Sequence, residues 1–211
     1  MDKNKDMLLD IHPDNPDPRK IEKAVNVLRK GGIIIYPTDT VYSMACDLNN
    51  RKAVEKMAQL KGLKVEKINF SLICYDLSHI SDFTVQFSNS IYKLLNRALP
   101  GPYTFILNAN TSVPKLFKSN KKTIGIRVPD NKIARAIIKE LGNPLLSTSV
   151  HDEDEILEYI TDPELIYEKY QNTVDMVIDG GFGHNHASTV IDCTENEPIV
   201  LREGIGSLSV I

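Results

Sequence analysis

Short apolar runs rich in β-branched residues recur along the whole chain, and most of them lie next to a glycine or a proline. The first run, 33–36, follows Gly31-Gly32 and ends at Pro37. Runs this short, bounded by turn residues, are typical of buried strands. Later runs occupy 70–74, 103–107, 123–128, 145–149, 176–178, 189–191 and 199–201. The chain is therefore predicted to build a large sheet.

Segments with helical spacing alternate with the early runs. Asp17-Pro18 is typical of a helix start, and apolar residues follow it at helical spacing up to Leu28. Further helices are predicted at 50–60, 88–98 and 131–141, while strands dominate the later chain. We therefore expect an α/β protein, a twisted mixed sheet with flanking helices. With 211 residues and no repeats or evident linker, residues 1–211 are predicted to form a single domain.

Nothing in the sequence indicates a membrane or a secreted protein. No stretch approaches the roughly 20 apolar residues that a membrane span needs, and the amino-terminal residues are polar and acidic. The three cysteines, Cys46, Cys74 and Cys193, lie far apart, which favours reduced thiols over disulfides or a zinc site. A cytoplasmic protein without a membrane partner is expected.

Charge is distributed unevenly along the chain. The net charge is -3, but residues 1–150 carry a formal +9 and the last 61 residues -12. Eight carboxylates lie between Asp152 and Glu168. Such blocks are typical of a surface that binds a polyanion beside a region that repels it, and an ordinary solvated surface is the alternative.

Polar residues gather where predicted strands end, as ligand-binding residues do in α/β sheets. Thr38, Asp39 and Thr40 follow the first strand, Ser147, Thr148 and Ser149 close another, and two arginines, Arg127 and Arg202, lie in or after later strands. Hydroxyls with guanidinium groups suit an anionic ligand that carries a carboxylate or a phosphate. The alternatives are that the threonines cap a turn, that Arg127 pairs with a carboxylate of the protein, and that Arg202 is an edge residue.

Other motifs are absent or weak. The sequence has no P-loop, no dinucleotide-binding glycine motif and no nucleophile elbow. His184 and His186 have no third ligand at metal-site spacing, so no metal site is predicted.

The segment GGIIIYPTDTVYSMACD, residues 31–47, resembles the signature of the YrdC/YciO family, which includes the threonylcarbamoyl-AMP synthases. PGPYTFIL, TIGIRVP, PLLSTS, STVID and VLREGIG follow in the family's order, so the resemblance covers residues 12–206. IHPDNPDP, SLICYDLS and the STS triplet are most similar to the YciO branch.

The resemblance implies a twisted α/β fold with a concave basic cavity and the binding of double-stranded RNA or tRNA. It implies an enzyme that joins L-threonine, bicarbonate and ATP, with Mg²⁺ accompanying the ATP as substrate and no tightly bound cofactor. Such catalysis is mostly positioning and charge stabilisation.

By the same resemblance, residues of this chain are assigned to two ligands. Threonine is expected at Thr38, Arg127 and Ser188, and the adenine nucleotide at Lys61, Thr123, Ser147, Ser149 and Arg202. The uneven charge, together with the shared fold, leads us to expect that lysines clustered in two loops bind RNA: Lys64, Lys67, Lys115, Lys118, Lys121 and Lys122.

Two motifs depart from the synthase pattern. Synthases carry K-x-R-P and S-x-N, where this chain has Lys61-Gly62-Leu63-Lys64 and Ser147-Thr148-Ser149. A lysine does not reproduce the two-pronged hydrogen bonding of the missing arginine. The expectation is therefore a nucleotide- and RNA-binding protein of tRNA modification or translation with weak or altered synthase activity. The alternatives are a working synthase with a rebuilt triphosphate site and a binding protein without catalysis.

Overall fold

The protein is described by a computed structural model that covers residues 7–65, 70–113, 122–149 and 161–211. Four of the lysines predicted to bind RNA lie outside these described residues: Lys67, Lys115, Lys118 and Lys121. So does the first part of the acidic run, residues 152–160. No helix within the described ranges is long and apolar enough to cross a membrane.

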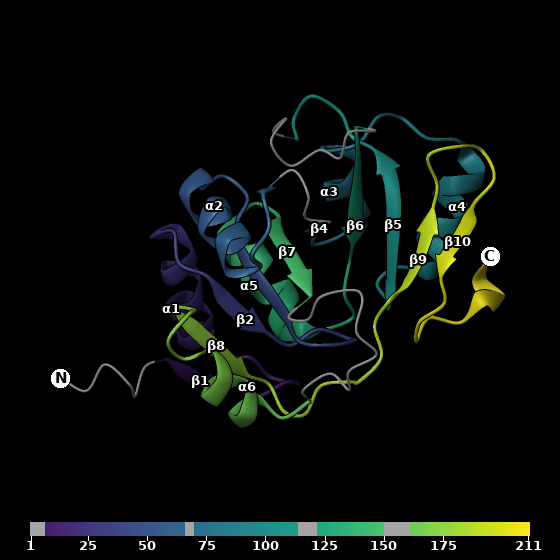
Figure 1. Ribbon diagram of the computed structural model, residues 1–211. Coiled ribbons are helices and arrows are strands. Elements are labelled where there is room, and N and C mark those ends of the chain that lie inside the picture. Colours follow the sequence, from purple (N-terminus) through teal and green to yellow (C-terminus); the bar gives the residue numbers. More distant parts are fainter. Residues whose placement is uncertain (1–6, 66–69, 114–121, 150–160) are drawn as a thin grey trace.

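The described residues form a ten-stranded mixed sheet in the order β1-β8-β2-β3-β7-β4-β6-β5-β9-β10. Figure 1 shows the sheet twisting from β1 and β8 on one side to β9 and β10 on the other. The strands are β1 (Leu8–Asp10), β2 (Ile34–Tyr36), β3 (Ser43–Asp47), β4 (Ser71–Ile73), β5 (Tyr103–Asn108), β6 (Thr123–Arg127), β7 (Leu145–Ser149), β8 (Met176–Asp179), β9 (Thr189–Asp192) and β10 (Ile199–Arg202). The mixed α/β sheet with flanking helices that the sequence predicts is confirmed.

Each main helix begins at a side chain that caps it. Asp17 accepts a hydrogen bond from the Arg19 N–H at the start of α1, and Asn50, Ser88 and Asn131 do the same for α2, α4 and α5. At its other end α5 stops at Gly142, which has a φ of 84°. The helices are α1 (Pro18–Arg29), α2 (Arg51–Leu60), α3 (Leu77–Ser81), α4 (Asn89–Ala98), α5 (Lys132–Leu141) and α6 (Pro163–Tyr170), and a final 3₁₀ turn covers Leu208–Val210.

Apolar side chains pack on both faces of the sheet. On one face a large cluster joins α2 and α4 to the strands, with Leu72, Phe105 and Ile126 among its buried members. On the other face a smaller cluster lies under α1 and α5 and includes Ile34 of β2 and Ile73 of β4. Because this second cluster contains no residue of β5, β6 or β9, that part of the second face is not covered by α1 and α5.

Candidate functional site

The uncovered part of the second face carries small and polar side chains. Several residues on this face, among them Ser71, Ile106 and Gly125, are partly exposed although they lie in interior strands of a wide sheet, while Thr104 and Arg127 are buried. The strand register places them in adjacent positions, with Ser71 opposite Gly125 and Gly125 opposite Ile106. We call this surface the open strip, and define it by Ser71, Thr104, Ile106, Thr123, Gly125, Arg127, Ser147 and Ser149.

Gly125 lets the side chains of Ser71 and Thr104 lie close together in the middle of the open strip. A Cβ atom at this position would lie 2.7 Å from the Ser71 Oγ and 3.3 Å from the Thr104 Cγ2. Both contacts are too close for an ordinary side chain, so the sheet here accepts only glycine without rearrangement. A glycine in a strand interior often marks a place where a ligand approaches the backbone.

Arg127 ends β6 and is buried at one end of the open strip, with 7% of its surface exposed. Its Nη2 donates to the Asp39 Oδ1 at 2.8 Å and to the Thr40 Oγ1 at 3.0 Å. The second oxygen of Asp39 accepts the N–H of Asp130 at 3.0 Å. The Arg127 Nε is buried and has no hydrogen-bond partner among the described residues. A buried donor of this kind is ready for an acceptor that the protein itself does not supply.

Thr38 shapes the turn that brings Asp39 to Arg127. Its hydroxyl donates to the Val41 carbonyl at 2.8 Å and accepts the Thr40 N–H at 3.0 Å. The Thr38 and Thr40 hydroxyl oxygens lie 3.1 Å apart. These contacts connect Thr38 to Arg127 through Thr40. They also show that Thr38 stabilises the turn, which was the alternative role given to it from the sequence.

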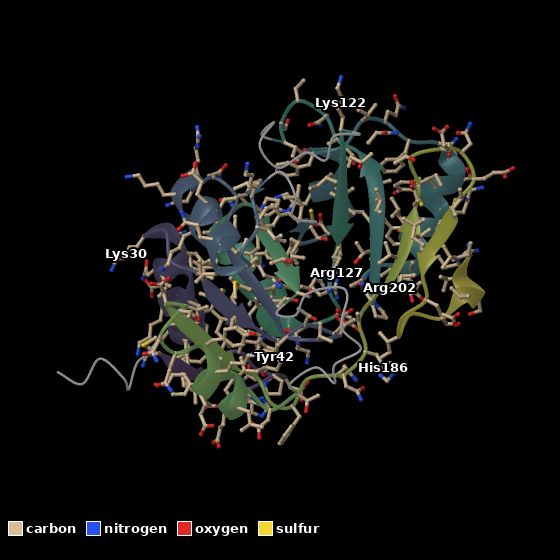
Figure 2. All side chains as sticks on the ribbon, in the orientation of Figure 1. Lys30, Tyr42, Lys122, Arg127, His186 and Arg202 are labelled. Atoms are coloured by element: carbon tan, nitrogen blue, oxygen red, sulfur yellow. The ribbon has the colours of Figure 1, made fainter. Side chains whose placement is uncertain are left out.

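Ser188 and Arg202 lie together beside the same end of the strip. The Ser188 Oγ lies 2.7 Å from the Thr104 Oγ1, and the register of β5 and β6 places Thr104 beside Arg127. Arg202 of β10 donates to the Ser188 carbonyl from Nε at 3.2 Å and from Nη2 at 3.1 Å. Thr104 and Arg202 are about a hundred residues apart in the sequence, and the sheet brings them together. Figure 2 labels Arg127 and Arg202 near the middle of the molecule.

Ser147 lies deeper in the strip than the other serines. It is 2% exposed, its hydroxyl donates to the Met44 carbonyl at 3.0 Å, and it lies 3.2 Å from the Tyr36 hydroxyl. Burial raises the pKa of Tyr36 to about 12, so this phenol keeps its proton at neutral pH. Ser149 and Thr123 lie at the strand ends on the same face of the sheet.

The described lysines occupy different surroundings. Lys61 is the C-cap residue of α2, which packs on the other face of the sheet, and Lys64 follows in an exposed segment. Lys122 is exposed directly before β6 and has a φ of 59°. The structure joins the predicted threonine-binding residues Thr38, Arg127 and Ser188 to Arg202.

Sequence reasoning missed Ser71, Thr104 and Gly125. A signal was present, because TIGIR and PGPYTFIL place a small residue between inward-facing apolar ones, at positions that alternate onto the opposite face of the sheet. Asp39 was noticed, but its pairing with Arg127 depends on a turn that periodicity does not predict. Among the described residues, no group of three histidine, cysteine or acidic side chains could hold a metal ion.

Comparison with known proteins defines the family. The Sua5/YciO/YrdC family, whose model carries the description telomere recombination, matches residues 26–204. The chain is 42% identical over 200 residues to the uncharacterised protein YciO of Escherichia coli K12, covering 94% of this chain and 95% of YciO. It is 30% identical over 173 residues to a threonylcarbamoyl-AMP synthase of Coxiella burnetii, covering 82% of this chain and 91% of the synthase.

Solved structures agree with this relationship. The crystal structure of Escherichia coli YciO superposes with a TM-score of 0.89 at 40% identity, covering 97% of this chain and 98% of YciO. A structure of P. abyssi Sua5 in complex with L-threonine shares the fold, with a TM-score of 0.82 at 24% identity, and this chain covers 57% of it. The chain belongs to the Sua5/YciO/YrdC family, and its relatives include YciO proteins and, at lower identity, threonylcarbamoyl-AMP synthases.

Proposed function

We propose that this chain is a YciO-type protein that binds an adenine nucleotide and double-stranded RNA and acts in tRNA modification or translation. It has weak or altered threonylcarbamoyl-AMP synthase activity. We further propose that residues 1–211 form one domain and that the protein works in the cytoplasm. Family membership supports the general class, and the open strip supports ligand binding.

The observation that carries the proposal is the buried Nε of Arg127, which has no partner within the described residues. Arg127 lies beside the hydroxyls of Thr104 and Ser188 and near Arg202. A carboxylate placed there would accept a charge-assisted hydrogen bond from Nε, which is among the stronger hydrogen bonds in proteins. In the proposed roles, Arg127, Thr38 and Ser188 hold L-threonine.

The nucleotide would lie along the strip from Arg202 toward Thr123, Ser147 and Ser149, with Lys61 serving the triphosphate. Gly125 is compatible with this placement, because a glycine in a strand interior often marks a place where a ligand approaches the backbone. ATP would bind as a substrate together with Mg²⁺. The Mg²⁺ ion would be held mainly by phosphate oxygens of ATP and by water, rather than by a dedicated set of protein ligands. The motif K-x-L-K, with Leu63 in place of arginine, is the reason to expect weak chemistry.

Two alternatives lead to different observations. A working synthase would turn over threonine, bicarbonate and ATP as fast as its relatives, with Lys61, Lys64 and Lys67 replacing the lost arginine. A binding protein without catalysis would use the same arginine and hydroxyls to hold a ligand, but it would release no pyrophosphate from ATP in the presence of threonine and bicarbonate. Measuring that release separates the first proposal from the last.

We expect ATP and AMP to bind, and Arg202→Ala to weaken both. Arg202 donates two hydrogen bonds to the Ser188 carbonyl and thereby presents its charge beside the strip. Loss of a charged hydrogen-bond partner commonly costs about 1.5–3 kcal/mol, or roughly ten- to a hundredfold in affinity. Isothermal titration calorimetry measures this directly. Arg19→Ala, which removes the same charge from the exposed surface of α1, is the control. Dissociation constants above millimolar for wild type, or equal effects of the two variants, would refute a nucleotide site here.

We expect tRNA binding that weakens steeply with salt. Lys115, Lys118, Lys121 and Lys122 are clustered in the sequence, and replacing all four by alanine should reduce the log–log salt slope by up to about 3, since each phosphate contact contributes about 0.7–0.9. Gel-shift titrations across a salt series measure the slope. The matched control replaces four exposed lysines of helices and helix ends, Lys23, Lys30, Lys52 and Lys93.

Recognition should follow the duplex backbone rather than sequence, because the chain carries no aromatic motif for stacking single-stranded bases. An equal drop in slope for both sets of four lysines would mean that the cluster has no special role. No binding to tRNA even at low salt would remove RNA from the proposed function.

A further inference from the structure

A second pocket lies outside the open strip, at the carboxyl ends of the parallel strands β4 and β6. It has a volume of about 290 Å³. Tyr75 and Asp76 follow β4, and Val128 directly follows Arg127, the last residue of β6. The carboxyl ends of parallel strands are where α/β sheets commonly bind ligands. The walls are mainly apolar and come from Tyr75, Leu77, Leu99, Pro100 and Val128, with Arg135 of α5 as the cationic member.

Arg135 has an unusual environment for a cation that lines an apolar pocket. Its guanidinium carbon lies 5.0 Å from the centroid of the Tyr75 ring, which holds the group in place by a cation–π contact. Its Nε is buried and lacks a hydrogen-bond partner among the described residues. Lys139, one helical turn later, places its Nζ 5.9 Å from the same ring. Two cations therefore converge on Tyr75, and one of them has a buried donor without an acceptor.

The nearby carboxylate of Asp76 is already engaged elsewhere. It accepts hydrogen bonds from the Ser78 hydroxyl at 2.6 Å and from the His79 N–H at 3.0 Å, and so caps α3. The hydrogen bond from Ser78, followed by that from His79, lowers the pKa of Asp76. Asp76 is therefore ionised at neutral pH. Asp76 is thus hydrogen-bonded to α3 rather than to Arg135, whose Nε remains without an acceptor among the described residues.

We propose that this pocket is a binding site for a small carboxylate with a compact apolar body, held by Arg135. The guanidinium Nε donates to the carboxylate, and the body packs between Tyr75, Leu99 and Val128. A bare phosphate fits the site poorly, because the walls offer apolar contact rather than the several donors that a dianion needs. The volume lies at the lower end of the range for ligand pockets, which favours a molecule of one ring or one branched chain.

This site does not depend on the proposed nucleotide and threonine site. It uses different side chains, and none of them belongs to the open strip. Val128 connects the two, since it lines the pocket and follows Arg127 in the chain. The two proposals can therefore fail separately.

Titration of the ¹⁵N-labelled full chain by NMR tests the site with defined probes. Benzoate and 3-phenylpropionate should shift the amide signals of Tyr75, Leu77 and Val128 saturably, with a dissociation constant of about 1 mM or lower. Benzyl alcohol, which keeps the ring but lacks the charge, should bind at least about tenfold more weakly. Inorganic phosphate, which carries charge without an apolar body, should leave these signals unchanged.

Variants at Arg135 distinguish its donor from its charge. Arg135→Met should weaken benzoate by about tenfold or more, and Arg135→Lys, which keeps a charge but loses Nε, should also weaken it several-fold. Arg19→Met is the matched control and should leave the affinity unchanged. The proposal is overturned if benzoate produces no saturable shift at the pocket, if benzyl alcohol binds equally well, if phosphate shifts the same signals as strongly, or if Arg135→Met binds benzoate like wild type. Preserved dispersion of the remaining amide signals shows that each variant is folded.

Discussion

Replacing Arg127 by methionine is expected to lower the free energy of unfolding by about 3–5 kcal/mol. The substitution keeps an unbranched, largely apolar stem but leaves the Asp39 carboxylate, whose side chain is 9% exposed, without its cation. Removing one partner of a buried ion pair costs this much because the other charge remains buried. Urea or guanidinium denaturation, followed by circular dichroism, measures the change.

A second substitution identifies the cause of this loss. Asp39→Asn in the Arg127→Met background removes the stranded charge while keeping an acceptor for the Asp130 N–H, so it should recover at least half of the lost stability. Arg19→Met on the exposed surface of α1 should change the free energy of unfolding by less than about 0.5 kcal/mol. The ion pair would have no structural role if Arg127→Met were as mild as that control.

The double substitution Leu63→Arg and Ser149→Asn is expected to raise the rate of threonylcarbamoyl-AMP formation by about 10²-fold. It restores the K-x-R-P arginine and the S-x-N amide of the synthase pattern, and one preorganised donor is commonly worth about 10²–10³ in rate. Leu63 is 43% exposed, so an arginine is accommodated without repacking the core. Pyrophosphate release in the presence of L-threonine, bicarbonate and ATP measures the rate.

The control for this rate increase is the double substitution Leu63→Lys and Ser149→Asn. It supplies a positive charge without the planar guanidinium group of arginine. It should recover much less of the rate, because lysine does not reproduce that geometry. The account would be wrong about these two motifs if wild type already turned over like a synthase, or if the arginine and lysine variants were equally active.

Local signals in the sequence predicted the helices well. Asp17, Asn50, Ser88 and Asn131 each cap the helix that the sequence assigns to them, since a short polar side chain before an apolar periodic segment satisfies the first N–H groups. Most strands also appear where short β-branched runs predict them. These features depend only on neighbouring residues, which is why one sequence suffices to find them.

β3 is a strand that local sequence signals did not predict. Ser43–Asp47 contains no β-branched or aromatic residue, and no strand was predicted there. It forms because it lies between β2 and β7 and its alternate residues Met44 and Cys46 enter the core. The order of the strands, with β7 inserted between β3 and β4, likewise follows from long-range packing rather than from any one segment.

The residues of the candidate site likewise include some that the sequence predicted and some that it did not. Arg127, Ser188 and Arg202 could be singled out because polar residues at strand ends are chemically conspicuous. Thr104 and Gly125 were missed, since their importance comes from lying across the sheet from other residues. Pairing of Arg127 with a carboxylate was one of the alternatives from the sequence and is confirmed, but Asp39 could not be named as the partner, because a turn of three residues and the end of a distant strand must both be placed first.

The central claim is that the open strip, with Arg127 and Arg202 at one end, is the ligand site of this protein. A crystal structure of the full chain grown with ATP and L-threonine tests it most directly. The account predicts a carboxylate oxygen within hydrogen-bond distance of the Arg127 Nε and a nucleotide lying against Gly125 and Ser147. Ligands ordered elsewhere on the protein, with the strip still empty and the Arg127 Nε still without an acceptor, would contradict it.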